Sequence, residues 1–494
     1  MTYDCDVVVV GLGPVGDVVA GLLALEGLKV VGIERDEVPY PLPRAAVFDD
    51  EIMRIFQRLG VAERLESLCR VPDKYEFVSA DDEVLLEFPV KGVPTVSGWE
   101  GSYVLHQPAV EGVLRDRLLD LAVDVRLGHR FVGVDQGADQ ALVHIEGPQG
   151  SYDLRARYVV GCDGAWSPVR QAVNIELFDY EFNEPWLVLD AVAPGGSALP
   201  NRLMQICDPA RPATYLKMTG DRYRWEFMVM PGETPAQALE EGFIRTLLSD
   251  WEIGDNLSIE RKAVYQFHGL VAKQWRSARV LLAGDAAHQM PPFAGQGMCA
   301  GIRDAGNLAW KLGSVIRGEA SEGLLDSYQA EREPHVRAVI ETAIAMGRII
   351  CLTDPQAAAG RNAEMLARRA SGAQEVSMQF PDLCNGCLDT SRGAGALFPQ
   401  PNVDGRRLDD VLGSGHWLVG HSLPELHLPA GVLAFDLSDP ALAPYAPALN
   451  AWLVAHEAAA VLVRPDHHVF GSGDPTELIA CLDRAGGANR RLAA

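Results

Sequence analysis

The chain has 494 residues, which is enough for roughly two to four domains with ample cores. Its 48% hydrophobic and 22% charged content is typical of a globular protein, and the net charge of −24 argues against nucleic acid or an anionic membrane as a partner. The nine cysteines are scattered and odd in number, and no apolar run reaches the length of a membrane span. We therefore expect a protein of the reducing cytoplasm that has no membrane partner.

A glycine-rich turn follows the first predicted strand. Four valines at 7–10 predict a buried strand, and the apolar spacing after the turn predicts a helix that ends at Gly27. Gly11 allows a tight turn, Gly13 lets the backbone approach a pyrophosphate, and Gly16 lets the helix pack closely on the strand. This pattern is typical of a dinucleotide-binding unit.

The second predicted strand, at 28–33, ends at Glu34, about 20 residues beyond the turn. A carboxylate at this position can accept a hydrogen bond from a ribose 2′-OH and would repel a 2′-phosphate. Asp17 is unusual, because it lies in the first turn of the helix that should face the phosphates. It would repel a pyrophosphate unless its side chain points away.

The sequence pattern divides the chain into four parts. Residues 1–175 alternate strand and helix patterns, which predicts an α/β domain. Residues 176–278 hold strand patterns separated by Pro and Gly, which predict an inserted, mostly antiparallel sheet. Residues 279–390 return to a strand followed by a helix over 301–316, and residues 391–494 are enough for a small α/β domain.

A second candidate ligand site follows the strand predicted at 279–283. Gly284 and Asp285 place a carboxylate at the carboxyl end of this strand, where α/β proteins bind ligands. The glycines at 295 and 297 come just before a helix and predict an edge of backbone N–H groups that favours an anion. We expect His288 to be structural, with a catalytic role as the alternative.

Three segments, in this order and spacing, resemble the class A flavoprotein aromatic hydroxylases of the para-hydroxybenzoate hydroxylase type. They are the glycine-rich turn, residues 161–170 (GCDGAWSPVR) and residues 284–288 (GDAAH). Four further segments are similar to the 3-(3-hydroxyphenyl)propionate hydroxylase branch of that family: 43–45, 48–51, 207–212 and 227–234. The resemblance covers about residues 1–350.

The resemblance implies an α/β fold with three components. These are a Rossmann-type FAD-binding domain, an inserted and mostly antiparallel β-sheet substrate domain, and a small C-terminal thioredoxin-like α/β domain. The corresponding predicted parts are 1–175 and 279–390 for the FAD-binding domain with its helices, 176–278 for the substrate domain and 391–494 for the C-terminal domain.

The resemblance also assigns roles to matching positions around a non-covalent FAD. The pyrophosphate would lie against Gly11, Gly13, Pro14, Val15 and Gly16. The adenosine would lie near Glu34, Arg35 and Val125. The rest of the cofactor would contact Arg44, Gln107, Asp163, Gly164 and Asp285, with the isoalloxazine flanked by Pro292, Gly295, Gln296, Gly297 and Met298.

The implied activity is hydroxylation of a phenol, with O₂ and with NADH or NADPH as co-substrate, and the substrate expected from the resemblance is a phenolic acid such as a 3-hydroxyphenylpropionate-like compound. The family does this through a flavin C4a-hydroperoxide, for which the protein must exclude water and align the ring. Two alternatives stay open: a tailoring monooxygenase or epoxidase that acts on a polycyclic or polyketide aromatic, and a non-enzymatic FAD-binding sensor. The sequence also leaves a homodimer open.

No single residue is singled out as the base that would activate a phenol. Asp49 could face the pocket, or it could be the N-cap of the following helix. Tyr215, Tyr265 and His268 lie in the predicted insert, as pocket or core residues.

The segment 355–405 is rich in Ala, Gly and Pro and is expected to be irregular. Cys384 and Cys387 form a CxxC in this segment, without a second ligand pair nearby in the sequence, so we expect no metal site and leave their role open. A thiol–disulfide flavoenzyme is disfavoured because no cysteine lies between Cys5 and Cys69. A flavin halogenase is disfavoured because its Trp-x-Trp-x-Ile-Pro segment is missing from the sequence.

Overall fold

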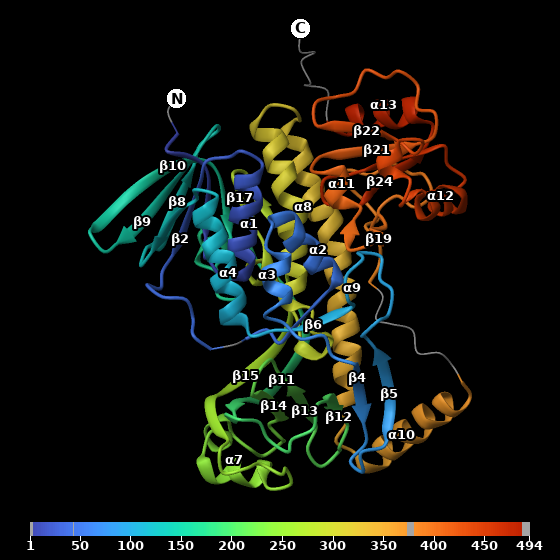
Figure 1. The fold of residues 1–494 in the computed structure, drawn as a ribbon. Helices are drawn as coiled ribbons and strands as arrows, with labels where there is room; N and C mark the ends of the chain where they lie inside the picture. The colour runs from blue at the N-terminus through green and yellow to red at the C-terminus, as the bar shows by residue number, and fades with distance from the viewer. Residues whose placement is uncertain (1–2, 43, 373–379, 487–494) are drawn as a thin grey trace.

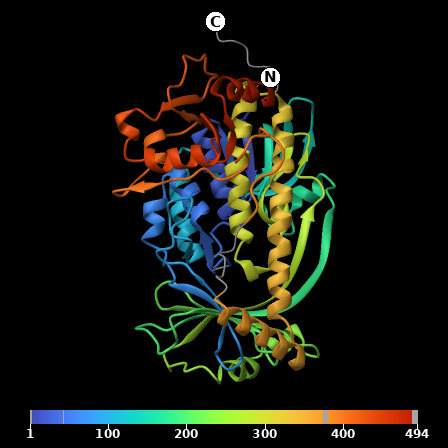
Figure 2. The ribbon, with the colours of Figure 1, turned by 90° about the vertical axis from the view of Figure 1, so that its right-hand side faces the viewer.

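The computed structural model describes residues 3–42, 44–372 and 380–486. Figure 1 shows an α/β body, a β-sheet lobe below it and a C-terminal unit beside the body. Two long helices, α8 (Gly297–Ile316) and α9 (Asp326–Ile350), run through the centre of the molecule, and Figure 2 shows α9 reaching from the body to the sheet lobe. No helix within these described ranges has both the length and the apolar character that a bilayer span needs.

The first sheet has the strand order β16-β17-β10-β1-β2-β7, with β9 paired to β10 and β8 paired to β9. Its central strand β1 pairs in parallel with β2 and β10, and β10 pairs in parallel with β17. The valines of β1 are buried in this sheet, where helix α1 (Pro14–Leu25) packs against β1 and β2 and strand β8 contacts β2. The strands are β1 (Cys5–Val10), β2 (Val30–Glu34), β7 (Asp124–Leu127), β8 (Arg130–Gln136), β9 (Ala141–Gly147), β10 (Gly150–Gly161), β16 (Arg276–Ser277) and β17 (Val280–Leu282).

Helices α1 (Pro14–Leu25), α4 (Gln107–Asp120) and α8 pack around this sheet, which confirms the predicted Rossmann-type architecture. Helix α1 ends at Leu25, and Gly27 has a left-handed φ of 78°, as predicted for a helix end. Helix α8 begins at Gly297, four residues before its predicted start. A glycine at the first helical position has low intrinsic propensity, so the first turn depends on burial of Cys299 and Ala300 rather than on local preference.

The second sheet forms the lobe at the bottom of Figure 1 and has the order β18-β15-β11-β14-β13-β12-β4-β5. Its pairs are antiparallel except β12 with β4. The strands are β4 (Lys74–Val78), β5 (Val84–Pro89), β11 (Leu177–Val192), β12 (Leu203–Ile206), β13 (Ala213–Lys217), β14 (Arg222–Met228), β15 (Ser258–Ala272) and β18 (His288–Gln289).

This sheet corrects the sequence-based boundary of the insert. The predicted insert, 176–278, supplies β11 to β15, but β4 and β5 come from the predicted first part of the FAD-binding domain and β18 from its second part. Local strand patterns do not reveal which sheet a strand joins, because that choice depends on pairing partners far away in the chain.

The segment expected to be irregular contains a helix. Helix α10 (Pro355–Ala370) begins at the N-cap Asp354, whose side chain accepts a hydrogen bond from the Ala357 N–H, and it packs against β5. Arg361 and Arg369 in this helix donate to the carbonyls of Cys207 and Val84 at 2.6 Å each. The helix is therefore held by contacts with the second sheet, which a composition-based prediction does not include. The remaining helices of the body are α2 (Asp50–Leu59), α3 (Ala62–Glu66) and α5 (Pro168–Ala172), and β3 (Val47–Asp49) pairs with β6 (Ser102–Val104). Helices α6 (Pro235–Ala238) and α7 (Glu241–Leu248) belong to the second-sheet lobe.

The C-terminal unit contains a mixed four-stranded sheet with the order β22-β21-β23-β24. Strands β21 and β22 are parallel, whereas β23 is antiparallel to both of its neighbours, an arrangement that fits the expected thioredoxin-like domain. Its elements are β19 (Asn402–Val403), β20 (Arg406–Arg407), α11 (Asp409–Leu412), β21 (His416–Gly420), β22 (Val432–Asp436), α12 (Ala446–Ala455), β23 (Ala460–Val463), β24 (Val469–Gly473) and α13 (Pro475–Ala485).

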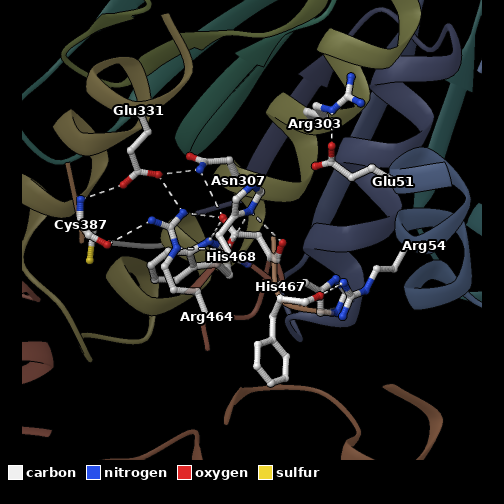
Figure 3. A network of polar contacts seen from close by, with 12 residues as sticks. Glu51, Arg54, Arg303, Asn307, Glu331, Cys387, Arg464, His467 and His468 are labelled. Carbon is white, nitrogen blue, oxygen red and sulfur yellow. Dashed lines mark hydrogen bonds and ion pairs between the residues drawn. The ribbon is translucent and has the colours of Figure 1, made fainter. Parts of the chain in front are cut away.

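A buried polar network joins this unit to the central helices (Figure 3). Arg464 pairs with Glu331 of α9 at 2.7 Å and with Asp466 at 2.5 Å, and Lys311 of α8 pairs with Glu331 at 2.8 Å. Burial alone would raise the pKa of Glu331, but the two cations hold it at about 2. The Cys387 N–H also donates to Glu331, so this cysteine contributes its backbone to the network.

We predict that Arg464→Met lowers the free energy of unfolding by about 3–5 kcal/mol, because it removes the arginine partner of buried Asp466 and leaves buried Glu331 with Lys311 as its cation. The change is measured from urea-induced unfolding. Arg392→Met is the control, since Arg392 pairs with Glu457 in solvent and its loss should cost about 0–1 kcal/mol. Equal effects of the two substitutions would contradict the role given to the buried network.

Candidate active site

A cavity of about 1000 Å³ lies between the α/β body and the second sheet. Its walls include the start of α1, the start of α8 and one face of the second sheet. Many of the residues predicted from the sequence line it: Gly13, Pro14, Val15, Arg44, Asp49, Gln107, Gly164, Asp285, Pro292, Gly295, Gln296, Gly297 and Met298.

The three motifs meet because three parallel strands end at the same edge of the first sheet. Val10 lies beside Gly161, and Gly161 lies beside Leu282. Arg170 then connects the second motif to the third, since its guanidinium donates to the carbonyl of Ala286 at 2.9 Å and to that of Ala165 at 2.8 Å. The structure thus brings the segments 11–16, 161–170 and 284–288 together.

The glycine turn is shaped by close backbone approach. A Cβ on Gly16 would lie 1.9 Å from the carbonyl oxygen of Gly11, and Gly11 itself has a φ of 89°. A Cβ on Gly13 would meet nothing within 4 Å, because this residue borders the cavity. Helix α1 has no side-chain N-cap, so its first N–H groups face the space in which a pyrophosphate would lie.

Asp17 does not face this space. Its carboxylate is buried and pairs with Arg115 of α4 at 3.2 Å, and Arg115 also donates to the carbonyl of Leu12 at 2.6 Å. Burial raises the pKa of Asp17, an effect that Arg115 opposes. Asp17, whose charge appeared unfavourable from the sequence, therefore supports the glycine-rich turn through Arg115 instead of facing the pyrophosphate space.

The adenosine side of the predicted site lies along β2 and β7. Glu34 accepts hydrogen bonds from the N–H groups of Leu12 at 2.8 Å and Asp36 at 3.1 Å, so its carboxylate lies against the glycine turn. Val125 lies on β7, opposite Gly32 of β2. Arg35 is exposed and pairs with Asp36 at 3.7 Å. These residues lie beyond the cavity that Gly13 borders.

The segment 161–170 supports the site through hydrogen bonds to the Asp163 carboxylate. The Asp163 carboxylate accepts hydrogen bonds from the hydroxyl of Ser167 and, at 2.9 Å, from the N–H of Val169, so it stabilises the start of α5 instead of facing the cavity. Gly164, with a φ of 83°, lines the cavity next to it.

Gln107 joins two segments that line the cavity. Its side-chain oxygen accepts hydrogen bonds from the N–H groups of Arg44 at 3.1 Å and Ala45 at 2.6 Å. The side chains of Asp285 and Arg44 both border the cavity. Desolvation by the surrounding protein raises the pKa of the Asp285 carboxyl, and the neighbouring His288 and Arg44 oppose this rise.

The two predicted catalytic candidates are held in other contacts. His288 is buried outside the cavity lining and bonds to Asp304 at 2.7 Å, so the structure supports the structural interpretation. Asp49 borders the cavity, but one oxygen caps α2 through the Ile52 N–H and the other accepts from Gln296 at 2.9 Å and from Arg303 at 2.6 Å. We therefore assign neither residue the role of base.

Other residues on the second sheet face the cavity and were not selected from the sequence. Gln205, Thr214 and Glu226 lie opposite one another on β12, β13 and β14. On β14, polar residues at every second position (Arg222, Arg224 and Glu226) among apolar ones were the available signal. Tyr265 and His268 also line the cavity, whereas Tyr215 is in the core and donates to the Pro200 carbonyl at 2.7 Å.

Within the described ranges, no group of three or more His, Cys, Asp or Glu residues could hold a metal ion. Cys384 is exposed, Cys387 is buried, and both are free thiols.

Comparison with known proteins identifies the family. The model for the FAD binding domain matches residues 4–343. The probable NADH-specific resorcinol 4-hydroxylase of Rhodococcus jostii is 39% identical, over 96% of this chain and 93% of its own. The 3-(3-hydroxy-phenyl)propionate/3-hydroxycinnamic acid hydroxylase of Mycolicibacterium gilvum is 35% identical, over 84% and 75%. The chain belongs to the FAD-binding family of flavoprotein aromatic hydroxylases.

Solved structures share the fold of this flavoprotein over nearly its whole length. The substrate-free rebeccamycin biosynthetic enzyme RebC has a TM-score of 0.79 at 23% identity, over 99% of this chain and 100% of its own. Aklavinone-11 hydroxylase, in a complex with FAD and aklavinone, has a TM-score of 0.77 at 22% identity, over 98% and 99%.

The residues of this flavoprotein fit FAD. The open side of Gly13 and the uncapped start of α1 suit a pyrophosphate, and the cavity continues from there to the start of α8. Gly297 opens this second helix, whose first N–H groups suit the electron-rich edge of a reduced flavin. When bound, FAD would supply hydride acceptance and O₂ activation, and the protein would orient it and exclude water.

We predict that Asp285→Asn raises the Kd for FAD about tenfold or more, because it removes a charged acceptor from the predicted ribityl position. Titration of the apoprotein with FAD, followed by flavin fluorescence, measures this change. The matched control is Asp255→Asn, an exposed residue of the second-sheet lobe. The same FAD affinity in both variants would contradict the assignment of Asp285.

Proposed function

We propose that this flavoprotein hydroxylates a small phenol in the cavity between its two sheets, with NADH as reductant and O₂ as oxidant. In the balanced reaction, the phenol, NADH, O₂ and a proton give the phenol with one additional ring hydroxyl, NAD⁺ and water. The observation that carries the proposal is that one continuous cavity joins the glycine edge of α1 to the polar residues on the second sheet. Cofactor and substrate can therefore lie against each other.

The names of the relatives support this chemistry and this substrate class. The Rhodococcus relative, similar over nearly its full length, is named as NADH-specific and as a hydroxylase of resorcinol. The Mycolicibacterium relative is named for a hydroxyphenyl acid. Both named substrates carry a hydroxyl on a single benzene ring, so we propose a monocyclic phenol.

Aromatic side chains form the apolar end of the proposed substrate site. Phe293, next to the start of α8, packs against Trp186 and Phe267 of the second sheet at ring-centroid distances of 5.4 and 6.0 Å. Phe293 and Phe267 line the cavity. Such walls exclude water from the reacting ring, which keeps reduction of O₂ coupled to hydroxylation.

The test is NADH consumption by the FAD-loaded protein with a panel of phenols that includes resorcinol, 3-(3-hydroxyphenyl)propionate and a polycyclic phenol. We expect a monocyclic phenol to accelerate NADH oxidation, with about one hydroxylated product per NADH. NADPH should be a poorer reductant. If NADH oxidation yields only H₂O₂ with every compound, or if only the polycyclic phenol is hydroxylated, the proposal is wrong.

A further inference from the structure

We propose that Glu226 and Thr214 select the substrate by binding two hydroxyl groups in a meta arrangement, with Glu226 as the base for the hydroxyl that activates the ring. This inference rests on the proposed function and adds a substrate class, the 1,3-dihydroxybenzenes, together with the residues that recognise it. It follows from the face that the second sheet presents to the cavity.

Two neighbouring rows of side chains form this face. In the first row, Gln205, Thr214, Glu226 and Val188 lie directly opposite one another across β12, β13, β14 and β11. In the second row, two residues along each strand, lie Leu203, Leu216, Arg224, Asp190 and Arg261. All of these residues except Asp190 line the cavity. A ring can therefore pack against the leucines while its substituents meet the polar row.

The polar row has a direction. The Thr214 hydroxyl donates to the Gln205 side-chain oxygen at 2.7 Å, and the Gln205 amide donates to the hydroxyl of Tyr75. Since the only proton of the Thr214 hydroxyl is used in this way, its oxygen is left to accept a hydrogen bond from a ligand. The hydrogen bonds along this row are thus donated from Thr214 to Gln205 and from Gln205 to Tyr75, in the direction away from Glu226.

Glu226 is the second acceptor. Its side chain makes no hydrogen bond with any residue in the described part of the chain, and its nearest ion-pair partner is Arg224 at 3.8 Å. Arg224 and Arg261 form ion pairs with Asp190, at 2.7 and 3.2 Å respectively. A buried carboxylate without a hydrogen-bond donor is costly unless a ligand supplies the donor.

The spacing of these two acceptors fits a meta diol. Directly opposed residues on antiparallel strands have their Cβ atoms about 4.5–5.5 Å apart. The two hydroxyl oxygens of a 1,3-dihydroxybenzene are separated by a similar distance, so one O–H can donate to Glu226 and the other to Thr214. A substrate carboxylate in place of the second hydroxyl has no proton to donate and would meet two hydrogen-bond acceptors, Thr214 and Glu226. The site is therefore predicted to discriminate against phenolic acids.

Glu226 activates the ring by taking a proton. The phenol O–H bond breaks, a new O–H bond forms on the Glu226 carboxyl, and the electron pair stays on the ring oxygen as a phenolate. The phenolate raises the electron density of the ring carbons ortho and para to it, where hydroxylation occurs. The proton returns to the product, which regenerates the carboxylate.

The electrostatic surroundings suit a base. Burial raises the pKa of Glu226; Asp190 on β11 adds to this rise, while Arg224 on β14 and Arg261 on β15 oppose it. Tyr75 on β4 also faces Glu226, and burial raises the pKa of its phenol above the ordinary value. The active, ionised form of Glu226 is lost as the pH falls, so kcat/KM should decline on the acid side at a pH above that of an ordinary Glu, about 4.3.

The experiment compares Glu226→Gln and Thr214→Val with wild type on resorcinol, phenol and 3-(3-hydroxyphenyl)propionate. For Glu226→Gln we expect kcat on resorcinol to fall about 100-fold. The activity of this variant should increase only as the pH approaches the pKa of a free phenol, about 10. For Thr214→Val we expect kcat/KM for resorcinol to fall about tenfold more than that for phenol. Wild type should prefer resorcinol to the phenolic acid, and Glu226→Gln should reduce this preference.

Two exposed residues of the same lobe provide matched controls, Glu252→Gln and Thr246→Val, which should behave as wild type. Flavin absorbance and FAD content show that each variant is folded. If wild type hydroxylates phenols but the pH profile and substrate preferences of the two site variants match those of the controls, this inference is wrong and the proposed function stands. If wild type hydroxylates none of the phenols, both fail.

Discussion

The alignment of three parallel strands is the constraint on which the rest of the site depends. Because β1, β10 and β17 run in the same direction, their carboxyl ends meet at Val10, Gly161 and Leu282. Arg170 then fixes the loops that follow, through the Ala286 and Ala165 carbonyls. The glycine edge, Gly164 and Asp285 come to one cavity mouth for this reason, although they are distant in the sequence.

The second sheet contributes rows of aligned side chains to the cavity. Its cavity face carries charged and polar side chains in two registered rows, and Asp190 lies between Arg224 and Arg261. Burying so many polar groups costs stability, and folded proteins accept such costs mainly where a ligand or a reaction needs them. The opposite face of this sheet packs on an apolar core: Trp225 and Phe227, on either side of Glu226, point into it.

The C-terminal unit also contributes to the candidate active site. Figure 3 shows how Arg464 and Glu331 join it to the central helices, and on the same side of the molecule Arg54 pairs with Asp409 at 2.7 Å. Leu397 and His468 from this unit line the cavity. The buried ion pairs therefore do more than attach a domain, since they also fix one wall of the candidate active site.

Some features follow from local sequence because they depend on neighbouring residues. The four valines, the glycine spacing and the position of Glu34 predicted the first βαβ unit, and the three motifs predicted a flavin site. Asp49 as a helix N-cap was also predictable, since capping involves a residue only three positions away. The sequence did not, however, distinguish this capping role of Asp49 from a catalytic role.

Tertiary structure decided what depends on distant partners. The sequence showed Asp17 as an unfavourable charge, and only the fold supplied Arg115 to pair with it. Composition suggested an irregular segment where contacts with β5 stabilise α10, and the domain boundary missed that β4 and β5 pair into the second sheet. Thr214 and Glu226 became neighbours only through strand register. Register depends on which strands pair and on the turns that join them, and the pattern within a single strand does not state either.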